Sequence, residues 1–147
     1  MKTITITSEF DEQKFIETAI YSLEEDGETL NGGHFLATAP EKWIKEKHTI
    51  FVATMNGAIV GYVVGYASGY HPDFIGYCFH QLWVSYDFRK RGIGRRFSEV
   101  IIDDAKEENC TRVTGWCHSK NIDFFKKLGF TVDVKPASKM PQFYMDI

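Results

Sequence analysis

The stretch from Gln81 to Gly94, which reads QLWVSYDFRKRGIG, constrains this chain more than any other. An apolar run ends at Val84, a short polar turn follows, and the basic and glycine residues of positions 89–94 precede a segment with helical spacing. Glycines let backbone N–H groups approach an anion, and a helix N-terminus adds partial positive charge. Arginines on the turn add formal charge and paired donors. The turn is therefore predicted to bind the pyrophosphate of a nucleotide-bearing cofactor. A strand-to-helix turn with solvated basic side chains is the simpler alternative.

The glycine pattern differs from the two commonest nucleotide-binding loops. A dinucleotide fingerprint has a third glycine and follows the first strand of a βαβ unit, and this stretch has neither feature. A phosphate loop continues with Gly-Lys-Ser or Gly-Lys-Thr, whereas Gly94 is followed by Arg95. The predicted cofactor therefore belongs to another class.

Length, composition and charge fit one globular domain, which we expect over residues 1–147. Of the 147 residues, 44% are hydrophobic and 25% are charged, so the chain can bury a substantial core. The net charge of −3 argues against nucleic acid as a main partner, because phosphate backbones are bound by clustered basic faces.

The sequence predicts neither a membrane span nor a metal site. No apolar run approaches the length that crosses a bilayer, and the first residues, MKTITIT, alternate like a strand rather than a leader peptide. The cysteines Cys78, Cys110 and Cys117 are odd in number and lack metal-ligand spacing, which indicates reduced thiols. The expected location is the cytoplasm.

Hydrophobic periodicity predicts strands and helices in the order β-α-α-β-β-β-α-β-α-β-β, an α+β fold with a mixed sheet. Strands are expected at residues 2–7, 49–54, 58–67, 75–84, 111–117, 130–134 and 142–147. Helices are expected after a capping box at Ser8 and Asp11, from Pro40, after the glycine turn, and at 119–128. Asn56-Gly57 predicts a tight hairpin, and Gly129 predicts a left-handed helix cap.

Three stretches resemble motifs of the GNAT superfamily of N-acetyltransferases. The glycine turn resembles the acetyl-CoA signature Arg/Gln-x-x-Gly-x-Gly/Ala, FVATMNGAIVGYVVG resembles the second hairpin, and FFKKLGF resembles the closing motif F-Y-x-K-L-G-F. The predicted element order agrees with the family order over essentially the full length. The resemblance implies a GNAT fold, with a mixed, mostly antiparallel sheet of about six or seven strands flanked by about four helices.

The resemblance also implies a function. It predicts an acyltransferase that moves the acetyl group of acetyl-CoA to a primary amine by direct attack in a ternary complex. A small-molecule amine is favoured as the acceptor. The alternatives are a protein lysine or N-terminal acetyltransferase and a non-catalytic acyl-CoA-binding regulatory module. Self-association as a homodimer is common in the family.

Carried over by motif, the resemblance implies contacts with acetyl-CoA along three segments. The arm of the cofactor would pair with the backbone of the strand before the turn, as an added strand would, and the turn would surround the pyrophosphate. His118 occupies the position of a family asparagine at the start of the closing helix. The expected contact residues are Leu82, Trp83, Val84, Arg89, Lys90, Arg91, Gly92, Ile93, Gly94, Arg95, His118, Asn121 and Phe125.

His80, four residues before Val84, is the candidate general base. An alkylammonium with a pKa near 10 is neutral about one part in a thousand at pH 7, so a group that removes its proton matters. Histidine accepts a proton at neutral pH, and the resemblance places His80 at the position of a catalytic histidine in the serotonin N-acetyltransferases. The alternative is a histidine bonded within the sheet or facing solvent.

Phe125 departs from the family pattern. The family often has a tyrosine there that protonates the departing thiolate, and a phenyl ring has no proton to give. Tyr144 is the candidate acid, and Tyr77 is a second possibility. A thiolate that leaves unassisted is also reasonable, because thiols ionise near pH 8.5. Binding of acyl-CoA without turnover is the other alternative.

Acceptor recognition is expected from the first two helices, their loop and the last hairpin. The acidic run around Glu25 suits a cationic amine, and aromatic walls suit an arylalkylamine. A solvated helix end and core aromatics are the alternatives. The candidate substrate-binding residues are Glu25, His34, Phe35, Trp43 and Cys78.

Overall fold

The computed structural model describes residues 3–25, 33–134 and 141–147, with side chains described from residue 39 onward in the second helix. The elements are β1 (Thr5–Thr7), α1 (Glu12–Glu25), α2 (Gly33–Lys45), β2 (Thr49–Met55), β3 (Ala58–Tyr70), β4 (Ile75–Val84), α3 (Ile93–Glu107), β5 (Arg112–Trp116), α4 (Ile122–Lys127), β6 (Thr131–Asp133) and β7 (Gln142–Asp146). Short 3₁₀ turns cover Tyr86–Phe88 and Ser119–Asn121. The predicted order of strands and helices is confirmed.

The seven strands form one mixed sheet in the order β1-β2-β3-β4-β5-β7-β6. β4 and β5 are parallel, whereas β1 with β2, β5 with β7 and β6 with β7 are antiparallel. The expected fold class, a mixed sheet of about seven strands with four helices, is therefore confirmed.

By its internal contacts the chain divides into two compact units. The N-terminal unit comprises Met1–Val64 and Gln81–Phe97, and the C-terminal unit comprises Gly65–His80 and Ser98–Ile147.

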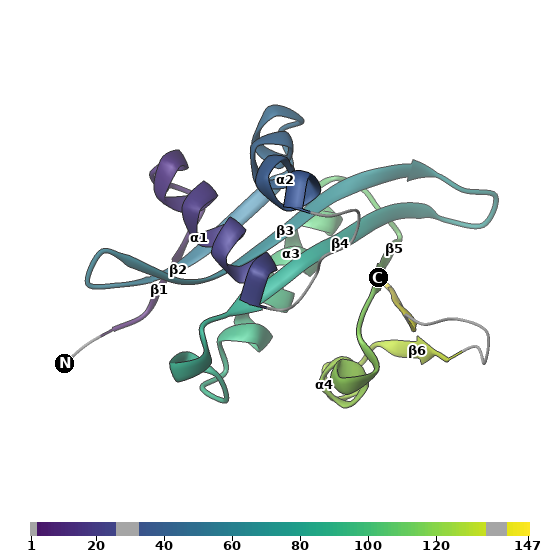
Figure 1. Ribbon diagram of the computed structural model, residues 1–147. Helices are drawn as coiled ribbons and strands as arrows, with labels where there is room; N and C mark the ends of the chain where they lie inside the picture. Colours follow the sequence, from purple (N-terminus) through teal and green to yellow (C-terminus); the bar gives the residue numbers. More distant parts are fainter. Residues whose placement is uncertain (1–2, 26–32, 135–140) are drawn as a thin grey trace. The chain divides into compact units, whose positions relative to one another are not determined.

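In the N-terminal unit, α1 and α2 lie side by side on one face of β2 and the first half of β3 (Figure 1). Phe15, Ala19 and Leu23 recur at helical spacing on α1 and are buried. They belong to a core that also contains Trp43 and Tyr62. The Tyr62 hydroxyl lies 2.5 Å from the Ser22 hydroxyl oxygen, so both buried hydroxyls have a hydrogen-bond partner.

The start of α1 differs from the predicted capping box. The Lys14 N–H donates to Oδ1 of Asp11 at 2.9 Å, and the Phe15 N–H donates to the Asp11 carbonyl at 3.0 Å. Asp11 is thus the N-cap, and the prediction that Ser8 caps the helix is wrong. The aspartate lies one turn closer to the apolar stripe, so its carboxylate reaches the first turn of the helix.

The predicted start of the second helix, α2, is also wrong. The helix begins at Gly33 rather than at Pro40, and Pro40 lies inside it. A proline removes one backbone donor from a helix but has a φ angle that a helix accepts. Ala39, Pro40 and Trp43 are all buried, and this apolar contact offsets the missing hydrogen bond.

Two predicted turns are confirmed by their backbone angles. Asn56 and Gly57 have φ angles of 52° and 80°, as the tight β2–β3 hairpin requires. Gly129 has a φ of 99° and follows α4 directly as a left-handed cap. β3 continues to Tyr70, three residues beyond the expected end at position 67.

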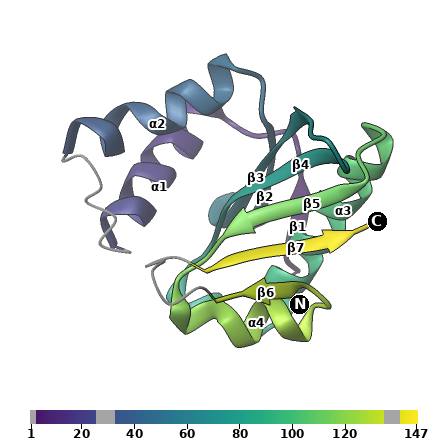
Figure 2. The ribbon, with the colours of Figure 1, turned by 90° about the vertical axis from the view of Figure 1, so that its right-hand side faces the viewer.

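In the C-terminal unit, β5 lies between β4 and β7, and β6 forms the outer strand beside α4 (Figure 2). One face of this part of the sheet is covered by a cluster of phenylalanines: Phe79, Phe125, Phe130 and Phe143. The rings of Phe125 and Phe143 stack with centroids 4.0 Å apart. Gly115 lies under Phe143 and provides the space for its ring.

We predict that Gly115→Ala destabilises the protein. A Cβ atom at Gly115 would overlap Cζ of Phe143 and would lie 2.8 Å from the backbone oxygen of Phe79. Such overpacking is expected to lower the free energy of unfolding by about 1–3 kcal/mol. Denaturant unfolding measures the change. Thr114→Ala, which changes the opposite face of β5, is the control and should cost less than about 1 kcal/mol. Equal stability of Gly115→Ala and the unsubstituted protein would contradict this packing.

Candidate active site

The glycine turn lies in the N-terminal unit, where β4 passes into α3. The Ser85 N–H donates to the Val60 carbonyl at 2.8 Å and fixes the end of β4. Lys90 and Gly92 then take positive φ angles of 63° and 83°, which bend the backbone sharply. The first hydrogen bond of α3 runs from the Arg96 N–H to the Gly92 carbonyl at 3.1 Å. A Cβ atom at Gly92 would meet nothing within 4 Å, so open space lies in front of the helix N-terminus.

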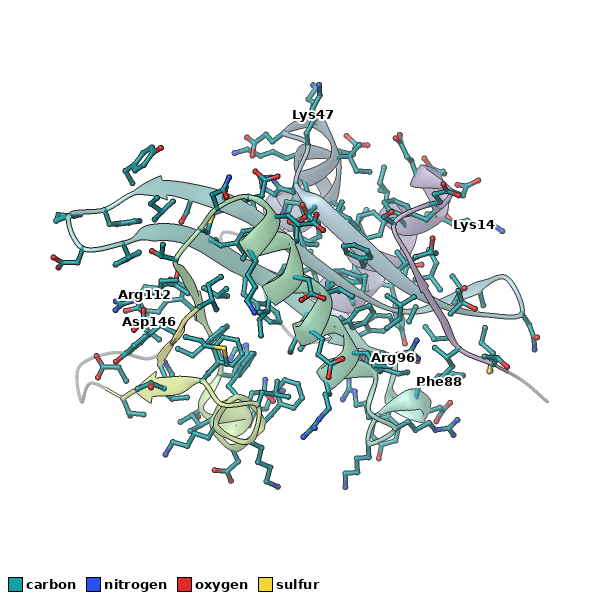
Figure 3. The ribbon with its side chains drawn as sticks, turned by 180° about the vertical axis from the view of Figure 1, so that it is seen from behind. Lys14, Lys47, Phe88, Arg96, Arg112 and Asp146 are labelled. Atoms are coloured by element: carbon teal, nitrogen blue, oxygen red, sulfur yellow. The ribbon has the colours of Figure 1, made fainter. Side chains whose placement is uncertain are left out.

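Basic side chains surround this turn, since five of the eight residues from Arg89 to Arg96 are Arg or Lys. The Arg91 guanidinium lies 5.2 Å from the centre of the Phe88 ring, and Arg91 and Arg95 are exposed. Figure 3 shows Phe88 and Arg96 at the start of α3. The turn thus combines formal positive charge with the positive end of a helix dipole.

Arg89 has protein partners on the same turn and on α1. Its Nε donates to the Val84 carbonyl at 2.8 Å, and its Nη2 lies 3.4 Å from Oε1 of Glu25. Glu25 also accepts a hydrogen bond from Tyr21, which raises the pKa of the Tyr21 phenol. Arg89 and Glu25 therefore connect the glycine turn to the end of α1 within the N-terminal unit.

The side chains of the strand before the turn, Leu82 to Val84, are buried or half-buried. Trp83 is buried, with its ring 5.9 Å from Tyr62 and 6.4 Å from Tyr21. Its indole Nε1 is buried without a hydrogen-bond partner among the described residues. Leu82 and Val84 are half-buried. The predicted pairing of a cofactor with the backbone of these three residues stays a prediction.

His80 lies in the C-terminal unit, on the half-buried side of β4. The Tyr66 ring meets the His80 ring edge to face at 5.7 Å. Burial raises the pKa of the neighbouring Cys78 thiol, and a hydrogen bond from Tyr66 lowers it to a smaller extent. Tyr66 thus contacts both the candidate base and the cysteine two residues before it.

The side chains of Tyr66, Cys78 and His80 lie on one face of the sheet, here called the open face. Burial alternates along β4 and β5, with Tyr77, Phe79, Val113 and Gly115 buried on the other side. Cys78 pairs with Thr114, and Thr114 pairs with Tyr144, so these side chains form a row across three strands. The open face consists of Tyr66, Cys78, His80, Arg112, Thr114, Trp116 and Tyr144.

Sequence reasoning did not single out Trp116 or Thr114, and it treated Tyr66 only as the start of a loop. The signal was present in the alternation of the β5 sequence. Once Val113, Gly115 and Cys117 are assigned to the core side, Arg112, Thr114 and Trp116 must face the other way.

The two tyrosines proposed as acids lie in different surroundings. Tyr77 is fully buried, and its hydroxyl donates to Oδ2 of Asp104 at 2.5 Å. Tyr144 lies on the open face, with the Arg112 guanidinium 4.7 Å from its ring centre. Arg112 also pairs with Asp146 at 2.6 Å, and Figure 3 shows these two side chains together. Of the two phenols, only Tyr144 is placed on the side that carries His80.

The other expected contact residues are distributed over several elements. His118 and Asn121 bound the 3₁₀ turn before α4, and the Asn121 N–H donates to the His118 carbonyl at 2.9 Å. Phe125 lies in the phenylalanine cluster. Trp43 belongs to the N-terminal core, with its ring 6.2 Å from that of Tyr62. The side chains of His34 and Phe35 lie outside the described residues.

A hollow of ≈ 480 Å³ between α1 and α2 has Ile16 and Ile44 in its lining and four charged residues around them. None of the predicted site residues lines it. Within residues 3–25, 33–134 and 141–147, no three His, Cys, Asp or Glu side chains are grouped to hold a metal ion. No described helix is long and apolar enough to cross a membrane.

Comparison with known proteins identifies the family. The model of the acetyltransferase (GNAT) family matches residues 9–130. This chain belongs to the GNAT family of acetyltransferases. It is therefore an acyl-CoA-dependent N-acetyltransferase by family, and acetyl-CoA is the acyl donor.

Several solved structures share the fold of this chain at low sequence identity. Ard1 from Thermoplasma volcanium has a TM-score of 0.74 and 22% identity, with 98% of this chain and 97% of that chain covered. A GNAT acetyltransferase from Staphylococcus aureus Mu50 has a TM-score of 0.71 and 17% identity, covering 98% and 99%. PaiA N-acetyltransferase from Thermoplasma acidophilum, solved in complex with coenzyme A, has a TM-score of 0.69 and 14% identity, covering 99% of both chains.

The glycine turn of this GNAT protein fits the pyrophosphate of acetyl-CoA. Gly92 leaves open space where a side chain would project, α3 directs its N-terminus to the turn, and exposed arginines flank it. Arg91 and Arg95 are available to bind phosphate oxygens, whereas Arg89 is already bound to Val84 and Glu25.

We predict that Arg91→Ala weakens coenzyme A binding about tenfold, because it removes one charge-assisted phosphate contact. Titration calorimetry at low ionic strength measures the dissociation constant, and the difference should shrink as salt is added. Lys106→Ala, at the far end of α3, is the control and should bind as the unsubstituted protein does. An unchanged constant for Arg91→Ala would remove Arg91 from the phosphate site.

Proposed function

We propose that this GNAT protein acetylates a small-molecule primary amine by direct attack within a ternary complex. The observation that carries the proposal is the position of His80, a titratable side chain on the open face of β4, braced by Tyr66. Histidine is the side chain whose ordinary pKa lets it accept a proton at neutral pH. Thr114 and Tyr144 add polar groups to the same face that can contact an amine.

In this proposal the glycine turn binds acetyl-CoA, the acyl donor. The N–H groups at the start of α3 and the Arg91 and Arg95 guanidiniums hold the pyrophosphate. The backbone of Leu82 to Val84 pairs with the arm of the cofactor as an added strand would. Acetyl-CoA supplies the acetyl group to be transferred.

His80 supplies the base. An alkylammonium must lose a proton before its nitrogen can attack, and His80 accepts that proton directly or through a water molecule. The amine nitrogen then forms a bond with the thioester carbonyl carbon, the carbon–sulfur bond breaks, sulfur leaves with the electron pair, and the nitrogen loses its second proton to solvent to give the amide. A thiolate with a pKa near 8.5 is a competent leaving group at neutral pH. Tyr144 is the proposed donor of a proton to it.

A covalent relay through cysteine is not part of the proposal. Burial raises the pKa of both the Cys78 and the Cys117 thiols, which disfavours the thiolate that would attack. Direct transfer to the amine needs no such intermediate.

We also propose a domain organisation and a cellular compartment for this protein. Residues 1–147 are proposed to form one acetyltransferase domain, because β3, β4 and α3 each continue from one compact unit into the other. Free thiols at Cys78, Cys110 and Cys117 support a reducing compartment such as the cytoplasm.

Thiol release from acetyl-CoA, measured with a chromogenic disulfide, tests the function. Polyamines, aminoglycosides, arylalkylamines, amino acids and short peptides are the acceptors to compare. Release that depends on one class of small amine is the expected result. Release only with peptides would favour a protein acetyltransferase. No release, while acetyl-CoA raises the melting temperature, would favour a non-catalytic binding module and overturn the proposal.

We predict that His80→Gln lowers kcat/KM about 100-fold at pH 7, within the range of general base catalysis. The loss should be smaller at pH 9, because the neutral fraction of the amine rises about tenfold per pH unit below its pKa. The pH dependence of the initial rate measures this. His71→Gln is the matched control, since His71 is exposed and stacks on Phe74 in the β3–β4 loop. A pH profile in His80→Gln parallel to that of the unsubstituted enzyme would exclude His80 as the base.

A further inference from the structure

Trp116 is a large apolar side chain that the fold leaves uncovered. It ends β5 and is 58% exposed, whereas the other two tryptophans, Trp43 and Trp83, are 4% and 6% exposed. Its strand neighbours Gly115 and Cys117 are buried, so the indole projects from the open face. An isolated exposed apolar residue is ordinary, and its neighbours decide whether it has a role.

The neighbours of Trp116 include the candidate base. β4 and β5 are parallel and pair in register from Gly76 with Arg112 to Phe79 with Gly115. His80 and Trp116 are each the next residue along, and both follow a buried residue on the same side of the sheet. Their side chains therefore leave the same face from neighbouring strands, one position beyond the last printed pair of that register, Phe79 with Gly115.

The residue paired with Trp116 on β7 is uncharged. Trp116 pairs with the neutral Gln142 of β7, and Gln142 pairs in turn with Asp133 of the outer strand β6. Arg112, at the other end of β5, is paired with Asp146 at 2.6 Å and lies between the rings of Phe74 and Tyr144. Among the described residues of this row, the carboxylate of Asp133 lies two strands away from Trp116, so a second cation, as in a polyamine, has no carboxylate directly beside the indole. A flat apolar group would find an aromatic surface.

We propose that Trp116 determines acceptor specificity and that the acceptor is a primary amine with an aromatic ring on a short alkyl chain. This inference rests on the proposed function. With the nitrogen at His80 and the ring against Trp116, the short alkyl chain of such an amine would cross from β4 to the neighbouring strand β5. Stacking against the indole contributes beyond the apolar area that it buries.

Kinetics with matched amines tests the proposal. Phenethylamine has an aromatic ring, cyclohexylethylamine has a saturated ring of similar size, and hexylamine has no ring. Trp116→Leu keeps apolar bulk but lacks an aromatic surface, and it should raise the KM for phenethylamine about tenfold while leaving the KM for acetyl-CoA unchanged. Trp116→Phe should restore most of the affinity. Tyr70→Leu, an exposed aromatic at the end of β3, should change neither constant.

Tryptophan fluorescence gives a readout that does not require turnover. Because Trp43 and Trp83 are buried, acrylamide should quench Trp116 almost selectively. Phenethylamine should protect this emission when coenzyme A is bound, whereas hexylamine should not. The quenchable component should be absent in Trp116→Phe.

Either of two outcomes would overturn the assignment. One is an equal effect of Trp116→Leu on all three amines, and the other is acrylamide quenching that no aromatic amine reduces. If these occur while amine-dependent thiol release and the His80→Gln pH profile behave as expected, the acetyltransferase proposal stands and only the assignment of Trp116 fails.

Discussion

The contact between the Phe143 ring and the bare backbone of Gly115 holds the C-terminal unit in its arrangement. β7 lies against β5 with a ring where any other residue would place a side chain. Phe79, Phe125 and Phe130 complete the cluster around that ring. Because one face of β4 and β5 is filled in this way, the alternate residues of both strands must point to the other face. The placement of His80, Thr114 and Trp116 on one surface thus follows from packing on the opposite side of the sheet.

The same cluster explains the departure at Phe125. Its ring stacks on Phe143 and meets Phe79 edge to face, so its immediate aromatic surroundings are hydrocarbon. A phenol placed there would need a hydrogen-bond partner, because a buried hydroxyl without one costs free energy. The phenylalanine favours packing at a position where many relatives keep a proton donor. A proton for the departing thiolate must then come from solvent or from a group on the opposite face of the sheet.

Much of the fold was accessible from the sequence, because its signals are local. Asn56-Gly57 and Gly129 require positive φ, and few residue types satisfy that requirement. The errors arose where local signals compete. Ser8 and Asp11 both favour a helix cap, and only the position of the apolar stripe decides between them. Pro40 is typical of a first turn, yet burial of its neighbours keeps it within α2.

Less of the candidate site than of the fold could be predicted, because only part of the site is local in the sequence. The glycine turn is contiguous in the sequence, so its residue types and spacing indicate an anion site directly. Trp116 and His80 are 36 positions apart, and only the register between β4 and β5 shows that they are neighbours. A pairing of distant strands leaves no short motif, so composition and spacing gave no sign of it.

Arg89 links residues that are far apart in the chain, since it donates to the Val84 carbonyl and lies beside Glu25 on α1. The family signature accepts either arginine or glutamine at this position. A glutamine amide is shorter and uncharged, and it would not match the carboxylate of Glu25 in the same way. Substitution at one of these two positions therefore relaxes selection at the other. Among homologues, an acidic residue at position 25 should accompany arginine at position 89, and neutral residues should accompany glutamine. The contact would then appear as covariation between the end of α1 and a turn 64 residues later in the sequence.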